Sequence, residues 1–156
     1  ERVLIQNCTY DTVHGMLTLG SESPHDRNII LRNCTSRNAN RVLWLKMRPD
    51  TPQQYEYVTV EHVTGKTRRI LVVRPWTQFF KPQQRMDMPQ SFCRNITVKN
   101  ITMDCENFFD VGTSDKYELC DFTFDHIRVS DVKDAFSATM IPGTKVNDVI
   151  INGKKR

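Results

Sequence analysis

The chain has 156 residues, of which 38% are hydrophobic, and its 22 basic and 18 acidic side chains give a formal net charge of +4. This length suits a single domain with its own core, and the apolar fraction excludes a disordered chain. No run of about 18 apolar residues is present, so no membrane-spanning helix is predicted. The modest positive charge favours an anionic partner, either nucleic acid or an acidic polysaccharide.

Five segments of the chain resemble one another, and a weaker sixth follows them. They read ERVLIQNCTYD from residue 1, DRNIILRNCTS from 26, YEYVTVEHVTG from 55, CRNITVKNITM from 93, LCDFTFDHIRV from 119 and VNDVIINGK from 146. The proposed equivalent positions are separated by steps of 26, 29, 38, 26 and 27 residues and are Val3, Ile29, Val58, Ile96, Phe122 and Val149. The longest step contains a polar stretch with prolines, and we expect residues 77–91 to be an inserted loop.

Each repeat shows two strand signals and no helical periodicity. The first is an alternation of polar and apolar residues, as over 95–101, which indicates a half-buried strand. The second is a short apolar run about a dozen residues later: MLTLG, VLWLK, ILVV, FFDVG and FSATM. A repeat that is too short to bury its own core must stack on its neighbours.

Parallel stacking of such repeats predicts an all-β fold, a right-handed parallel β-helix built as a single β-solenoid of about six coils. A jelly roll or a propeller would need tight hairpin turns, and the only Asn-Gly dipeptide is at 152–153. The first residues already alternate between polar and apolar and do not form a signal peptide. We therefore expect residues 1–156 to be one β-helix segment, the C-terminal part of a larger β-helix domain.

The repeat also changes how the cysteines and the glycosylation sequons are interpreted. Cys8 and Cys34 are 26 residues apart, so they are expected to stack as small core residues, whereas Cys105 and Cys120 remain candidates for a disulfide. No cysteine or histidine spacing matches a metal site, and no metal or cofactor is predicted. Four Asn-X-Thr sequons begin at Asn7, Asn33, Asn95 and Asn100, where asparagine suits a tight corner between strands.

The outward side chains of the second strand in each repeat are expected to line one elongated face, which suits a linear polymer. This face carries one histidine, several cations and two tryptophans. Indole rings pack on the C–H faces of sugars, and cations hold carboxylates. The candidate residues are His14, Thr18, Ser21, Glu22, Arg41, Trp44, Lys46, Arg48, Arg74, Trp76, Asp110 and Thr113.

The stretch VHGMLTLGSE at 13–22, followed by VLWLKM at 42–47, resembles the signature of the family 28 glycoside hydrolases, the polygalacturonases. Their signature has a Gly-His-Gly stretch ending in Gly-Ser and then an Arg-Ile-Lys stretch one coil later. His14, Gly15, Gly20, Ser21 and Glu22 match the first part, and Lys46 matches the lysine of the second. Trp44 stands where that family has its arginine, and Val13 and Met16 replace glycines.

The resemblance implies a pectin-lyase-like β-helix and inverting hydrolysis of pectin-type acidic polysaccharide, with one carboxyl group as acid and another as base. The family's Asn-Thr-Asp and Asp-Asp motifs are absent from this sequence, so the catalytic aspartates are expected upstream. His14 then sets the protonation of those carboxylates, and Lys46 binds a substrate carboxylate. The expected substrate-binding set is Lys46, Trp44, Arg48, Trp76, Ser21 and Glu22.

A second hypothesis is a non-catalytic β-solenoid that binds an acidic polysaccharide. A nucleic-acid partner is disfavoured because no recognition motif accompanies the charge. Taken singly, His14 also suits a strand-end histidine, and Glu22 and Lys46 suit solvated surface charges. The resemblance implies a secreted or periplasmic protein, and an exposed coil end is expected to promote self-association.

Overall fold

The structure is a computed structural model that describes residues 2–78, 90–130, 132–133 and 136–156. The predicted insertion at 77–91 lies mainly outside these residues. The described part is mostly strand, with one short 3-10 helix. Its elements are β1 Val3–Gln6, β2 Thr9–Tyr10, β3 Leu17–Leu19, β4 His25–Met47, β5 Gln54–Pro75, β6 Ser91–Val111, β7 Tyr117–Ser130, η1 Ala138–Met140, β8 Lys145–Ile151 and β9 Lys154–Lys155.

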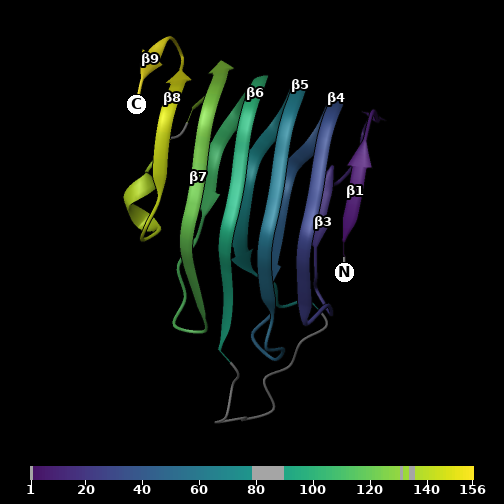
Figure 1. Ribbon diagram of the computed structural model, residues 1–156, viewed down its shortest axis with the longest axis vertical. Helices are drawn as coiled ribbons and strands as arrows, with labels where there is room; N and C mark the ends of the chain where they lie inside the picture. The colour runs from purple at the N-terminus through teal and green to yellow at the C-terminus, as the bar shows by residue number, and fades with distance from the viewer. Residues whose placement is uncertain (1, 79–89, 131, 134–135) are drawn as a thin grey trace.

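These strands form one open sheet in the order β1-β4-β5-β6-β7-β8-β9, with β2 and β3 also paired to β4. Within that sheet all pairs are parallel except β8 with β9. Figure 1 shows β4 to β7 side by side, each following the bends of its neighbour. The two strands expected in each repeat are therefore continuous in β4, β5 and β6. The fold is all-β and consistent with a solenoid.

The strand register confirms most of the predicted repeat. Val3 pairs with Ile29, Ile29 with Val58, Val58 with Ile96, and Ile96 with Phe122. The sixth position was wrong, because Val149 pairs with Ile127 and not with Phe122. Val149 and Ile127 each follow a residue at positive φ, Asp148 and His126. The last repeat therefore enters the sheet one corner later than its sequence suggested.

Two columns of residues with positive φ mark the corners where the strands bend. All four sequon asparagines belong to them, with φ values between 52° and 58°. Asparagine tolerates this left-handed region better than most side chains, so the prediction that these residues occupy corners is confirmed. The first column is Asn28, Tyr57, Asn95 and Asp121, and the second is Asn7, Asn33, His62, Asn100, His126 and Asp148.

Inward side chains stack in columns and form one continuous core. Leu17, Leu43, Leu71 and Phe109 follow one another in register across four strands, and all are buried. Contacts of this kind remove apolar surface from water, at about 25 cal/mol per Å². This column joins the predicted second apolar runs of the first four repeats.

The cysteines join this core without cross-links. Cys34 is 2% exposed and lies beside the part-buried Cys8, as the repeat predicted. The structure contains no Cys105–Cys120 disulfide. Cys105 is in register with Thr67 and Cys120 with Arg94, so the two thiols occupy different positions in the repeat.

The fifth apolar run, FSATM at 136–140, does not continue the second strand as expected. Its last three residues form the 3-10 helix η1. Phe136 instead directs its ring into an aromatic cluster, with centroids 4.9 Å from Phe108, 5.3 Å from Phe109 and 5.4 Å from Phe124. The segment therefore covers the phenylalanines of the core at this end.

The two ends of the sheet differ in how well they are covered. At the β1 end, the inward-facing Val3 is 40% exposed and Leu4 is 51% exposed. In the described residues, β1, β2 and β3 pair with β4 alone, so their outer edges carry unpaired backbone groups. β8 is instead flanked by β9, whose Lys154 and Lys155 place charge at that edge. Uncovered edges with apolar side chains promote association, whereas lysines oppose it.

We predict that a protein of residues 1–156 self-associates through the β1 edge. Val3→Glu should shift it toward the monomer, because association would then bury a carboxylate. Light scattering across a concentration series measures this. The control is Met140→Glu, which changes another exposed apolar side chain, 39% exposed and remote from β1 in sequence. A monomer with a cooperative melt at high concentration contradicts the prediction.

Candidate functional site

The candidate site lies on the outward face of β4, β5 and β6, where alternation turns polar side chains away from the core. Leu43, Leu45 and Met47 are buried, and the intervening Trp44 and Lys46 are only partly covered. The register places three columns on this face. They are Arg41 with Arg69; Thr18 with Trp44, Val72 and Asp110; and Lys46 with Arg74.

Two tryptophans and a lysine form the centre of this face. The rings of Trp44 and Trp76 meet edge to face, with centroids 5.2 Å apart and planes at 79°. The Lys46 ammonium lies 4.3 Å from the centroid of each ring, which is within the range of cation–π attraction. The backbone N–H of Trp76 donates to the carbonyl of Met47 at 2.7 Å, which fixes the second indole beside the first. Lys46, Trp44 and Trp76, predicted from sequence as one set, are therefore together.

Two arginines share one carboxylate next to this centre, and a third arginine stacks on Trp44. Asp110 is 15% exposed and accepts a hydrogen bond from Arg74 Nε at 2.7 Å. Its second oxygen lies 3.2 Å from Arg69 Nε. Arg41 stacks on Trp44, with its guanidinium carbon 3.8 Å from the ring centroid. Hydrogen bonding to Asp110 raises the pKa of Arg74, and burial followed by the charge of Arg69 lowers the pKa of Arg41.

His14 lies at the margin of this face. It precedes β3 and is exposed, and its carbonyl accepts a hydrogen bond from Arg41 Nη1 at 3.1 Å. The neighbouring backbone is aligned by a bond from Asn40 N to Val13 O at 2.8 Å. His14 thus stands beside Arg41, whereas Thr18 is the residue that pairs with Trp44. A surface hollow of about 360 Å³ is lined by Thr12, Val13, His14, Asn38, Ala39, Asn40 and Arg68.

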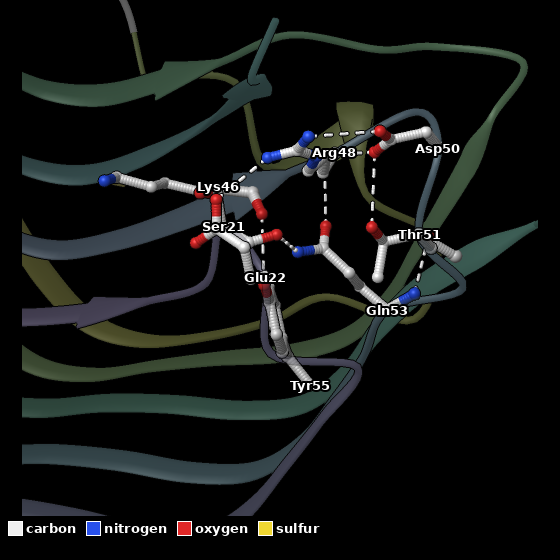
Figure 2. A network of polar contacts seen from close by, with 9 residues as sticks. Ser21, Glu22, Lys46, Arg48, Asp50, Thr51, Gln53 and Tyr55 are labelled. Carbon is white, nitrogen blue, oxygen red and sulfur yellow. Dashed lines mark hydrogen bonds and ion pairs between the residues drawn. The ribbon is translucent and has the colours of Figure 1, made fainter. Parts of the chain in front are cut away.

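Ser21, Glu22 and Arg48 belong to a separate polar network (Figure 2). Arg48 donates from Nε to Asp50 at 2.6 Å and from Nη1 to Glu22 at 2.9 Å. The carbonyl of Ser21 accepts from Gln53 Nε2 at 2.6 Å. These bonds tie the turn after β3 to the link between β4 and β5. In Figure 2 the Lys46 side chain points away from this network.

The network also provides an acidic partner for Arg48. Its side chain is 15% exposed and that of Asp50 is 19% exposed, and the two make a fork-to-fork pair. The hydrogen bond from Arg48 lowers the pKa of Asp50, and the same bond raises the pKa of Arg48. With its donors engaged in this way, Arg48 holds the turn and belongs to a different set of contacts from the indoles.

Sequence reasoning missed Arg69, which ends the basic run KTRR at 66–69 and is not among the candidate residues named above. The residue is a half-buried neighbour of Arg41 and also donates to Asn40 Oδ1 at 3.0 Å. The signal was its position, 28 residues after Arg41 and within the range of the repeat steps. No group of three His, Cys, Asp or Glu side chains in the described residues is arranged to hold a metal ion. Nor does this part of the chain contain a helix long and apolar enough to cross a membrane.

Comparisons of the chain with protein-family models, with curated proteins and with solved structures found no match.

We predict that Arg48→Gln lowers the free energy of unfolding by about 2 kcal/mol at pH 7, because Asp50 loses its partner. Since the folded pKa of Asp50 is depressed, the stabilisation is present above the unfolded value of about 3.9 and is lost as pH falls through the folded value. Denaturant titrations of both proteins between pH 7 and pH 2.5 should therefore converge below about pH 4.

The matched control for this prediction is Glu22→Gln, which removes the partner that is 77% exposed. An exposed ion pair contributes less than about 1 kcal/mol, so this variant should remain close to the wild type. A stability difference for Arg48→Gln that does not change with pH would contradict the role assigned to Asp50.

Proposed function

We propose that this chain is part of a polygalacturonase-like glycoside hydrolase of family 28, with the right-handed parallel β-helix fold of the pectin-lyase type. In this proposal the face of β4, β5 and β6 binds an acidic polysaccharide of the pectin type, and the protein is secreted or periplasmic. The in-register parallel strands support the fold. The motif around His14 and Lys46 supports the family.

One observation carries the binding part of the proposal. The Lys46 ammonium is fixed between two indole rings at 4.3 Å from each. A uronic acid presents a carboxylate beside a flat C–H surface, so it complements a cation that stands next to aromatic rings. Trp44 also supports Arg41, which lies 3.8 Å from its ring. The indole thereby holds two cations at the position where the family has one arginine.

The hydrolytic part rests on the resemblance and on carboxylates outside this chain. Inverting hydrolysis needs one protonated carboxyl group and one carboxylate on opposite sides of the glycosidic bond. Near the proposed face, Asp110 is paired with Arg69 and Arg74, and Glu22 is paired with Arg48. We therefore assign the acid and the base to upstream residues. In this scheme the exposed His14 ring hydrogen-bonds one of those carboxyl groups and sets its protonation.

The second candidate function is a β-solenoid that binds acidic polysaccharide without cleaving it. The pairing of Asp110 with two arginines favours it, because this carboxylate is held as a structural counter-ion. Both candidates use the same cations and indoles. They differ only in whether the carboxylates of a hydrolase accompany them.

For binding, we predict that Lys46→Met weakens the affinity for oligogalacturonate by about tenfold, because a charge-assisted contact is lost. Isothermal titration calorimetry at low salt measures this, and added salt should weaken wild-type binding as well. The matched control is Lys99→Met on another column of β6, where the lysine pairs with Glu61 at 2.9 Å. Equal losses in the two variants, or no loss in either, would contradict the assignment of Lys46.

For hydrolysis, the chain extended by its upstream coding sequence should release reducing ends from oligogalacturonate. His14→Ala in that protein should lower kcat by about 100-fold or more, the usual contribution of a group that controls proton transfer. The control is His62→Ala, since His62 is an exposed corner residue in β5. Binding without release of reducing ends by the extended wild type would decide for the non-catalytic solenoid.

A further inference from the structure

The arginine pair Arg41 and Arg69 has an arrangement that structural stability alone does not explain. The two residues are in register on adjacent parallel strands, whose backbones run about 4.8 Å apart. Like charges directly opposite each other on a sheet are destabilising. The described neighbours compensate only part of this cost, since Asp110 lies against Arg69 and Arg74 but makes no ion pair with Arg41.

The donors of the pair are only partly used. Arg41 donates from Nη1 to the carbonyl of His14, and Arg69 donates from Nη1 to Asn40 Oδ1. Nε of Arg41 is buried without a hydrogen-bond partner, and Nε of Arg69 lies 3.2 Å from Asp110 without the alignment of a hydrogen bond. Each arginine thus has an aligned acceptor at Nη1 and none at its buried Nε. Two guanidinium groups are therefore held in place with N–H groups to spare.

We propose that Arg41 and Arg69 form an oxyanion subsite beside Lys46 and Trp44, and that it takes a carboxylate or a sulfate ester carried by the bound sugar chain. Planar guanidinium groups offer paired N–H donors at the spacing of two oxygens on one anion. An anion bound here would offset the repulsion between the two guanidinium groups. The site rests on the proposed function only in that the anion belongs to a sugar chain.

The electrostatics around the pair support the same assignment. The pKa of Arg41 is lowered by its burial and by the charges of Arg69 and Arg68, with Asp110 opposing them. The neighbourhood is thus short of negative charge. Arg68 itself is paired with Glu106 at 3.2 Å, so it does not need a ligand. Trp44 covers one face of the Arg41 guanidinium and leaves its N–H edge as the part that meets an anion.

The subsite gives the face a second recognition point for anions. Arg41 and Lys46 stand on either side of Trp44 in the sequence, and both cations contact its ring. A ligand that satisfies both points must carry two acidic groups along one chain. The two points together therefore predict the specificity of the face: polymers with frequent acidic groups bind, and neutral or sparsely charged polymers do not.

The test titrates the chain with three trisaccharides: trigalacturonate, a sulfated galactotriose and neutral galactotriose. Calorimetry gives the affinities, and ¹H–¹⁵N spectra follow the arginine Nε–H resonances. We expect at least one anionic trisaccharide to bind and to shift the resonances of Arg41 and Arg69, and the neutral one to bind at least tenfold more weakly. Arg41→Gln and Arg69→Gln should each weaken anion binding by about 10- to 100-fold. Arg69→Lys keeps the charge but loses the fork, so it should lie between them and the wild type.

The matched control is Arg32→Gln, which removes the same charge from another outward column, where Arg32 donates to Gln6 at 3.0 Å. Melting temperatures show which variants remain folded, and the Nε–H shifts of the wild type report on the site without any substitution. Binding of sulfated galactotriose alone supports the subsite and contradicts the pectin substrate. The inference is overturned if no anion shifts the two arginines, if the neutral trisaccharide binds as tightly, or if folded Gln variants bind like the wild type.

Discussion

In-register parallel pairing between β4, β5 and β6 is the constraint on which the rest of the structure depends. Each residue faces the equivalent residue of the next repeat, so any property of one position is multiplied into a column. The same rule stacks Leu43 on Leu71 in the core and Arg41 on Arg69 outside it. For apolar groups such stacking is favourable, whereas stacked like charges repel one another unless other groups neutralise them.

The contacts of the candidate site offset part of this repulsion. Asp110 lies against Arg69 and Arg74. Arg41 and Lys46 each make a cation–π contact with the ring of Trp44. Each of these contacts offsets part of the repulsion, and none of them uses all the donors. A surface of this kind is held in shape by the core beneath it and keeps a deficit of negative charge. In the proposed function, this fixed arrangement of cations is what an anionic ligand would meet.

The sequence was sufficient for most of the repeat and for the centre of the candidate site, because both depend on local alternation. Ile29, Val58 and Ile96 were aligned correctly since each lies in a strand of alternating residues. Val149 and the run at 136–140 were misplaced, because the end of a stacked fold is shaped by what must be covered there. Lys46 and Trp76 were found by their place in the repeat, but their mutual contact through space was not. The ion pairs of Arg48 with Asp50 and of Arg69 with Asp110 were not foreseen, since these partners come from outside the local alternation.

The corner residues carry a consequence for how such a chain can vary. In four successive repeats the two corners are five positions apart: Asn28 and Asn33, Tyr57 and His62, Asn95 and Asn100, Asp121 and His126. The steps between the first three of these repeats, 29 and 38 residues, differ by nine, yet this interval does not change. Length can therefore be added or removed outside the interval without altering the face it encloses. A protein designer would therefore keep the five-residue spacing between the corners and vary the length of the rest of each repeat.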